Sequence, residues 1–342
     1  MVDSGHGAWQ MGASQGMSEA TARLETERLG SPSAPGHASF AKQALWVLGF
    51  TLGVILFGAV VRITGSGAGC GQHWPTCQGE VIHLPRKLST LIELTHRITS
   101  GLSAIAVFWL TVRAFRTFSK GAPVRRATAT ASALMIVEAL IGAALVRLAL
   151  VENNASVARA VIMSLHLVST SALTASLGLA AWWSLPSANL GLVRAPGSGL
   201  GKLGLLAAAL VLLVSASGAV TALGDTVYPV QPGALARLSD IEAPSAHFLE
   251  RLRVVHPVLA IGAALALLAL ATRAFDPRFS RATRAFAKAV LGLCLLQVAL
   301  GSVNVLLSAP GFIQVLHLLV ASLLWLSLVL LSAELLEPRT PL

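Results

Sequence analysis

The chain has 342 residues, of which 55% are hydrophobic and only 12% are charged. Soluble domains usually carry about 25% charged residues, so the composition excludes a soluble globular protein and indicates an integral membrane protein. The formal net charge of +10 does not indicate a nucleic-acid-binding protein. The basic residues lie in short segments between long apolar runs, where such residues set membrane topology.

The first 41 residues differ from the rest of the chain. They are rich in Ser, Gly, Ala and Thr and contain a small mixed-charge patch at Arg23–Arg28. This composition is typical of disorder, and we expect residues 1–41 to form a disordered extension. The segment lacks the basic start, short apolar core and small-residue cleavage site of a signal peptide.

Eight apolar stretches follow, and each is long enough to cross a bilayer, which takes about 20 residues. They run over Ala44–Ile63, Leu91–Val112, Ala127–Leu148, Ala158–Trp182, Leu203–Leu223, Leu252–Thr272, Ala285–Leu307 and Phe312–Leu335. Their apolar residues are continuous, which predicts transmembrane helices rather than the alternating strands of a β-barrel.

The segment between the first two spans, Gly69–Pro85, reads "GCGQHWPTCQGEVIHLP". It holds Cys70 and Cys77, two of the three cysteines of the chain, together with His73 and His83. Two cysteines in a polar loop are compatible with a metal site, a redox pair or a structural disulfide. The loop residues alone leave all three open.

Four of the nine histidines lie within apolar spans, one near the start of each even-numbered span. They are His96, His166, His256 and His317. An ionisable residue inside a span is a candidate for function, and imidazole suits heme iron, zinc and copper. Because none of the close-spaced partners of a zinc site surrounds these residues, we expect bis-histidine heme sites. The alternative is four neutral histidines that bridge helices by hydrogen bonds.

An internal repeat relates the two halves of the chain. The tripeptide "GAV" recurs at Gly58–Val60 and Gly218–Val220, and the histidines of spans two and four recur in spans six and eight. A repeat of four helices has parallel topology, related by a pseudo-twofold axis along the membrane normal. It pairs the two histidines of each half and predicts one heme-sized site per half.

The expected fold is therefore all-α, an integral membrane protein whose eight transmembrane helices form two pseudo-twofold-related four-helix bundles. The bundles are expected at residues 42–185 and 203–336, with a linker at 186–202 and a tail at 337–342.

The basic residues also predict the orientation. Spans two and three are joined by a segment with five bases and no acid: Arg113, Arg116, Lys120, Arg125 and Arg126. Spans six and seven are joined by a segment with five bases and one acid: Arg273, Arg278, Arg281, Arg284, Lys288 and Asp276. Positive charge marks the cytoplasmic side. The termini and the linker are therefore expected in the cytoplasm, and the cysteine loop and the four histidines toward the outer side.

The surroundings of the histidines differ between the halves. Glu93 precedes His96 by three residues and shares its helix face, whereas Arg253 stands three residues before His256. A carboxylate beside one iron ligand could accept protons during an oxidation, or it could form an ion pair with Arg97. Arg97 and Arg253 are candidate partners of heme propionates, with interfacial snorkelling as the alternative.

Two further polar residues lie inside the odd-numbered spans. Glu138 in span three and Gln297 in span seven hold matching positions, and we expect both to hydrogen-bond between helices. A proton route through Glu138 is the less favoured reading. Cys294 lies in an apolar run and is expected to be a buried thiol.

The chain resembles the heme A synthase family of bacterial plasma membranes and mitochondrial inner membranes, in the class with two cysteines in its first loop. The matching motifs are "RITGSGAGCGQHWPTCQGEVIHLP", "IELTHRITSG" at the start of span two, and one histidine in each of spans four, six and eight. The resemblance extends from about Phe40 to Leu335. It implies an oxidoreductase that converts the C8 methyl of heme O to a formyl group by successive hydroxylations, giving heme A for cytochrome oxidase.

The resemblance also implies roles for single residues. His96 and His166 would bind the heme O substrate, His256 and His317 would hold a permanent heme b, and Glu93 would be catalytic. Implied partners are heme O synthase and cytochrome oxidase assembly factors in a bacterial plasma membrane, with a homo-oligomer as a further candidate. The alternatives are a di-heme b electron-transfer cytochrome and a heme carrier or assembly chaperone, and the presence of Glu93 at one site favours catalysis over both.

The family's pair of loop cysteines matches Cys70 and Cys77. Cysteines pair readily in the oxidising compartment outside the membrane, so we expect a disulfide between them. Zinc bound by these cysteines with His73 and His83 is the alternative. Whether the disulfide only braces the loop or also passes electrons stays open.

Overall fold

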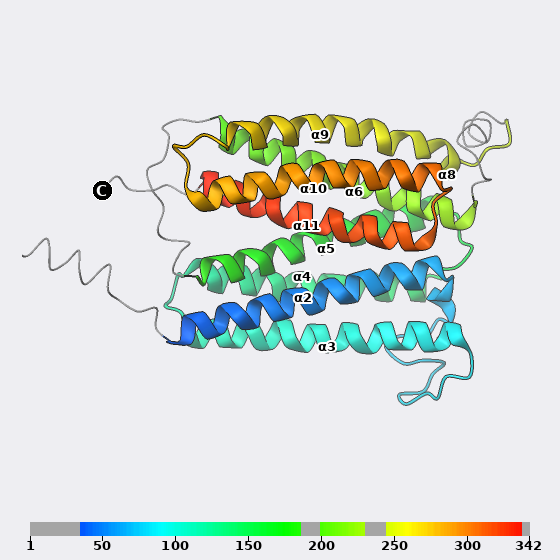
Figure 1. Ribbon diagram of the computed structural model, residues 1–342. Helices are drawn as coiled ribbons and strands as arrows, with labels where there is room; N and C mark the ends of the chain where they lie inside the picture. Colours follow the sequence, from blue (N-terminus) through cyan, green and yellow to red (C-terminus); the bar gives the residue numbers. More distant parts are fainter. Residues whose placement is uncertain (1–34, 186–198, 230–243, 337–342) are drawn as a thin grey trace, which may run out of the picture.

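The structure, a computed structural model, describes residues 35–185, 199–229 and 244–336. Within these ranges eight helices are long and apolar enough to cross a membrane, which confirms the eight predicted spans. The helices run side by side along one axis (Figure 1). Their bounds are α2 Pro35–Ile63, α3 Leu88–Thr117, α4 Pro123–Arg147, α5 Val157–Trp183, α6 Leu200–Val227, α9 Val255–Arg273, α10 Arg281–Leu306 and α11 Gly311–Leu336. Two short elements, α8 Phe248–Arg251 and the 3-10 turn η3 Leu252–Val254, lead into α9.

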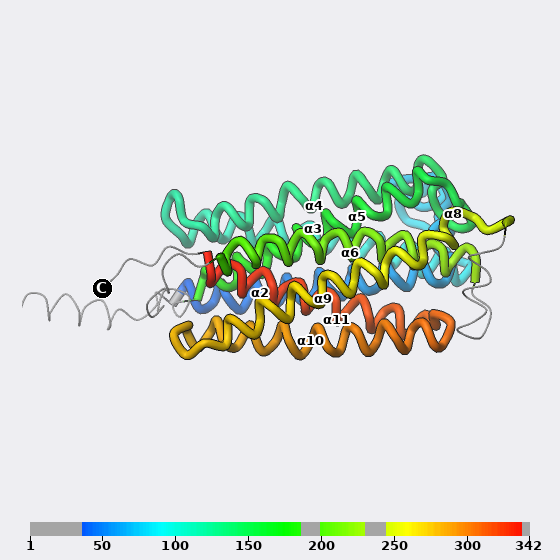
Figure 2. The backbone as a smooth tube through the Cα atoms, turned by 90° about the horizontal axis from the view of Figure 1, so that it is seen from above, coloured from blue at the N-terminus to red at the C-terminus, as the bar shows by residue number. Residues whose placement is uncertain are grey.

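Each half is a closed ring of four helices. In the first half α2 contacts α3 and α5, and α4 contacts α3 and α5; in the second half α6 contacts α9 and α11, and α10 contacts α9 and α11. The halves meet where α5 contacts α6 and α11, and where α2 contacts α11. Figure 2 shows α4 and α10 on opposite flanks of the bundle. The same neighbours therefore recur in both halves, while the pseudo-twofold axis itself stays a prediction.

Each half buries its own apolar core. Val107 and Leu177 are fully buried in the first half, and Val290 and Leu328 are fully buried in the second. Many other large apolar side chains point outward. Three of them are Ile105, Leu140 and Leu265, each more than 60% exposed. Such a surface is a liability in water and is the expected one for helices that face lipid.

The chain enters its first helix earlier than the sequence predicted. α2 begins at Pro35, so the prediction of a disordered extension is wrong for residues 35–41. Proline favours the first turn of a helix, and Phe40 is fully buried with its ring edge-on to Phe118 at 5.0 Å. This aromatic contact anchors the added turns. Residues 1–34 of the extension, residues 186–198 of the linker and the tail at 337–342 lie outside the described residues.

The predicted cysteine loop follows α2 and lies at the end of the bundle opposite the start of α2 and the end of α11 (Figure 1). We call this end of the bundle the loop end. The four intramembrane histidines lie in the half of the bundle nearer to it, because α3, α5, α9 and α11 all begin there.

Candidate functional site

Two histidines of the second half lie close together near the loop end. His256 is at the start of α9 and His317 is in the second turn of α11. Their ring centroids are 6.5 Å apart, and the ring planes are inclined at 75°. Nδ1 of His256 lies 3.1 Å from the carbonyl oxygen of Val214 and 3.1 Å from Oγ of Ser217. A histidine that donates from Nδ1 to a carbonyl keeps Nε2 free as a ligand nitrogen.

The other histidine of this pair has a different partner. Nε2 of His317 lies 2.9 Å from Nε2 of Gln297 on α10, and its buried Nδ1 has no hydrogen-bond partner among the described residues. The prediction that Gln297 bonds between helices is confirmed. A ligand that took the Nε2 nitrogen of His317 would displace this amide.

His96 of α3 and His166 of α5 are the corresponding histidines of the first half. The helices that carry them, α3 and α5, both pack against α2 and α4. Nδ1 of His96 is buried without a hydrogen-bond partner among the described residues. Nδ1 of His166 lies 2.8 Å from Oε2 of Glu138 on α4, an ion-pair distance at an angle outside hydrogen-bond geometry, and the His166 side chain is 35% exposed. The structure therefore brings together His256 and His317, the second-half pair that the repeat predicted, while the pairing of His96 with His166 stays a prediction.

Glycines allow a neighbouring helix to approach one imidazole in each half. A Cβ atom added to Gly58 would lie 3.1 Å from Cε1 of His96, and one added to Gly218 would lie 3.0 Å from Cε1 of His256. Few real Cβ atoms come this close to a neighbour, so a side chain at either position would push the ring away. These glycines are the first residues of the two "GAV" tripeptides. The sequence repeat therefore corresponds to a repeated cradle for a histidine.

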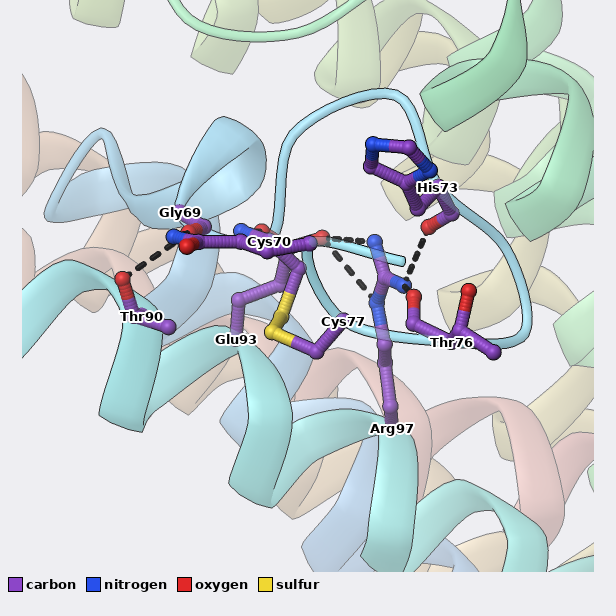
Figure 3. Close-up of polar contacts among 9 residues, drawn as sticks. Gly69, Cys70, His73, Thr76, Cys77, Thr90, Glu93 and Arg97 are labelled. Carbon is purple, nitrogen blue, oxygen red and sulfur yellow. Dashed lines mark hydrogen bonds and ion pairs between the residues drawn. A yellow bond between two sulfur atoms is a disulfide. The ribbon is translucent and has the colours of Figure 1, made fainter. Parts of the chain in front are cut away.

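Glu93 joins the cysteine loop to α3 (Figure 3). Its side chain is almost fully buried. Oε2 accepts a hydrogen bond of 2.7 Å from the backbone N–H of Cys70, and Oε1 forms an ion pair with Arg97. Arg97 also donates to the carbonyl oxygens of His73 and Thr76, at 2.6 and 2.7 Å. The alternative predicted for Glu93, an ion pair with Arg97, is confirmed, and both residues bind the loop.

The cysteine loop is closed by a disulfide between Cys70 and Cys77, whose Cα atoms are 4.5 Å apart. Both cysteines are buried, and Thr90 of α3 donates a hydrogen bond of 2.8 Å to the carbonyl oxygen of Gly69 beside them (Figure 3). The predicted disulfide is confirmed. The zinc alternative fails because the thiols are consumed, and the described ranges hold no group of three metal-binding side chains.

The matches to known proteins agree with this arrangement. Residues 41–88 and 84–329 match the model of the COX15-CtaA family, described as cytochrome oxidase assembly protein. Together these ranges take in all four histidines and all the spans except the start of the first and the end of the last.

The chain belongs to the COX15-CtaA family.

This COX15-CtaA chain is similar to named proteins of two kinds. It is 43% identical over 304 residues to a protein of Thermus thermophilus named protoheme IX farnesyltransferase, a match that covers 89% of this chain and 49% of the relative. It is 43% identical over 93 residues to heme A synthase of Staphylococcus haemolyticus and 41% identical over 93 residues to that of Staphylococcus carnosus. Those two matches cover 27% of this chain and 31% and 30% of the relatives. The chain thus spans about half the length, or less, of these relatives, and the predicted resemblance to heme A synthases is confirmed.

The second-half pair of this COX15-CtaA protein has a spacing suited to heme. A metal–imidazole bond is about 2 Å long and a ring nitrogen lies roughly 1.2 Å from its centroid, so two axial imidazoles have centroids about 6.5 Å apart. The observed separation of His256 and His317 is 6.5 Å. The spacing of the two rings therefore suits a bis-histidine heme, for which Gln297 would have to release Nε2 of His317.

Arg253 is held by protein acceptors. It is 3% exposed, its Nε lies 3.0 Å from Asp225, and it donates to the carbonyl oxygens of Gly224 and Tyr228. This burial argues against interfacial snorkelling. Arg97 is likewise held by the loop, so the role of both arginines toward heme propionates stays a prediction.

Cys294 is buried, as predicted.

Sequence reasoning missed Arg62, at the loop end of α2. Its Nη1 donates to the carbonyl oxygen of Ala222 and to Oγ1 of Thr226, at 2.7 and 2.6 Å. Its Nη2 donates to Oε1 of Gln314 at 2.8 Å. Arg62 therefore ties the first half to both α6 and α11. A base two residues after the first "GAV" tripeptide was the available signal.

Proposed function

We propose that this chain is a heme A synthase, an oxidoreductase that converts the C8 methyl of heme O to a formyl group and so produces heme A for cytochrome oxidase. Family membership supports the reaction class. The observation that carries the proposal is that different polar residues stand beside the two histidine pairs. Glu93 and Glu138 accompany the pair of the first half, whereas Arg253 and Gln297 stand at the matching positions of the second half.

In this proposal the two pairs have different occupants. His96 and His166 bind the iron of heme O, the substrate, and place its C8 methyl for oxidation by two hydroxylations and loss of water. His256 and His317 hold heme b, which when bound supplies one-electron redox chemistry. The hydrogen bond from Nδ1 of His256 to a backbone carbonyl fixes the tautomer that leaves Nε2 for iron.

Glu93 has two tasks in this proposal. It is one helical turn from His96 and is the buried carboxylate that can accept a proton as the substrate is oxidised. It also holds the N–H of Cys70 at 2.7 Å. The loop is thereby fixed at the loop end of α3, above the first histidine pair, where it limits the entry of water.

The proposed location is the bacterial plasma membrane, with the loop end outside and both termini in the cytoplasm. The basic segments between α3 and α4 and between α9 and α10 lie at the end opposite the loop end. Because positive segments stay in the cytoplasm, that end is the cytoplasmic one.

The Thermus relative suggests where the substrate comes from. The match covers 89% of this chain but only 49% of that relative, which is named protoheme IX farnesyltransferase. We place the farnesyl transfer in the part of the relative that this chain does not match. The second candidate, that this chain itself transfers the farnesyl group, is favoured only by the relative's name.

One expression experiment tests both candidates. The chain is produced in a host that makes heme O but not heme A, and in a host that makes neither. Heme A synthase activity yields heme A in the first host only. Formation of heme O from protoheme in the second host would support the farnesyltransferase candidate instead, and heme B alone in both hosts would count against both.

A further inference from the structure

Glu138 places a carboxylate against one ligand histidine in the interior of the bundle. It lies in the middle of α4, and its side chain is 12% exposed. Oε2 lies 2.8 Å from Nδ1 of His166 and accepts a hydrogen bond of 2.7 Å from Oγ1 of Thr170, one turn further along α5. Thr170 is itself buried. The hydroxyl thus holds the oxygen that faces the imidazole.

The matching position of the second half holds an amide in place of the carboxylate. Gln297 stands at the position of Glu138, and Ala321, four residues after His317, stands at the position of Thr170. The partner of His256 is the carbonyl oxygen of Val214, which is neutral. Among the described residues, His166 is the one of the four histidines for which a carboxylate oxygen within 3 Å of a ring nitrogen is seen.

A carboxylate at Nδ1 changes what a histidine can do as a ligand. It accepts the Nδ1 proton, which leaves Nε2 as the unprotonated ligand nitrogen and fixes the ring orientation. It also raises the basicity of the ligand. A more electron-donating axial ligand stabilises the oxidised form of an iron and lowers its reduction potential.

We propose that Glu138 is a positioning residue that acts through His166, so that the iron bound in the first half has a lower reduction potential than the heme iron of the second half. This inference rests on the proposed binding of heme by both pairs, and it does not require that heme A is formed. The difference would make the substrate iron the more easily oxidised of the two.

The test is a potentiometric titration of the purified full-length protein carrying heme b and loaded with heme O. We expect two one-electron components. Glu138→Gln introduces the residue found at the matching position of the second half. It should raise the lower reduction potential by at least about 59 mV, which is a tenfold change in the ratio of reduced to oxidised iron. The higher reduction potential should stay unchanged. Glu138→Asp keeps the charge and should recover part of the shift. The ferric low-spin electron paramagnetic resonance signal of the same component should change in Glu138→Gln.

Two further variants keep the inference testable if Glu138→Gln does not fold. Thr170→Ala removes the hydroxyl that holds the carboxylate and should move the same component by less. Ser171→Ala, whose hydroxyl bonds the carbonyl of Leu167, is the matched control and should move neither component. The inference is wrong if both components stay in place in Glu138→Gln and Thr170→Ala.

Heme A formation is measured in the same preparations. If heme A is formed and neither reduction potential shifts, the proposed role of Glu138 is wrong and the proposed reaction stands. If one component shifts and no heme A is formed, the proposed reaction fails while the role of Glu138 stands.

Discussion

Arg62 donates a hydrogen bond of 2.7 Å to the carbonyl oxygen of Ala222, the residue that holds the position of Arg62 in the second half. The contact spans 160 residues, which is the offset of the repeat. It reaches from the end of α2 in one half to α6 in the other, near the loop end. An arginine present in one half only therefore adds hydrogen bonds to the junction between the two halves.

Loss of this arginine should loosen the junction between the halves. Hydrogen bonds from a charged group contribute about 1.5–3 kcal/mol each. We expect Arg62→Met to lower the free energy of unfolding by about 3 kcal/mol, measured by thermal unfolding in detergent. Arg278→Ala removes an exposed ion pair with Asp276 and should give no measurable change. Equal melting temperatures for both variants would show that Arg62 does not join the halves.

Gly218 should be needed for heme retention. A methyl group at this position would lie 3.0 Å from the ring of His256, so Gly218→Ala must move the imidazole. We expect the heme content per protein, measured after purification, to fall severalfold. Gly262→Ala is the matched control, because open space surrounds that helical glycine; it should retain heme and gain about 0.5–1 kcal/mol of stability. Full heme content in Gly218→Ala would contradict the cradle.

Glu93→Ala should separate substrate oxidation from cofactor binding. The variant loses the buried carboxylate of the first half but leaves the second histidine pair untouched. We expect heme b to be retained and heme A formation to fall by about 10²–10⁴-fold, the usual contribution of a general acid–base group. Thr90→Val removes another bond between the loop and α3 and should have a much smaller effect. Normal heme A formation by Glu93→Ala would overturn the assignment.

Opening the disulfide should cost stability before it costs heme b. Closing so short a loop contributes about 2–3 kcal/mol in the chain-entropy model. We expect the double variant Cys70→Ala, Cys77→Ala to melt at a lower temperature but to bind heme b at the wild-type level. The hydrogen bonds of Arg97 to the loop carbonyls remain in this variant. Full heme A formation would assign the disulfide a bracing role, and loss of heme A with an intact fold would assign it a redox role.

The helices and the second-half histidine pair could be predicted from the sequence because each depends on a strong local pattern. Eight continuous apolar runs correspond to eight helices, and the repeat placed His256 with His317. The start of α2 was missed because its first turns depend on a contact between Phe40 and Phe118, which are distant in sequence.

The polar contacts of the site were harder to predict. The sequence placed Glu93 and Arg97 on one face of a helix but could not show that both bind the loop backbone. Almost every residue has the same backbone N–H and C=O groups, so a sequence does not show which of them bind a side chain. Arg62 and Glu138 act on helices that the repeat alone does not bring into contact. The partners of Arg62 follow from the packing of α2 on α11 and of α11 on α6, and the partners of Glu138 from the packing of α4 on α5.

The most direct test of the proposed function is the pigment made by a host that supplies heme O and has no heme A of its own. The hemes are extracted from membranes that contain the wild-type chain and from membranes that contain Glu93→Ala, and are separated by chromatography. The proposed function predicts heme A with the wild-type chain, and heme B with unconverted heme O for the variant. Heme B and heme O without any heme A from the wild-type chain would contradict it.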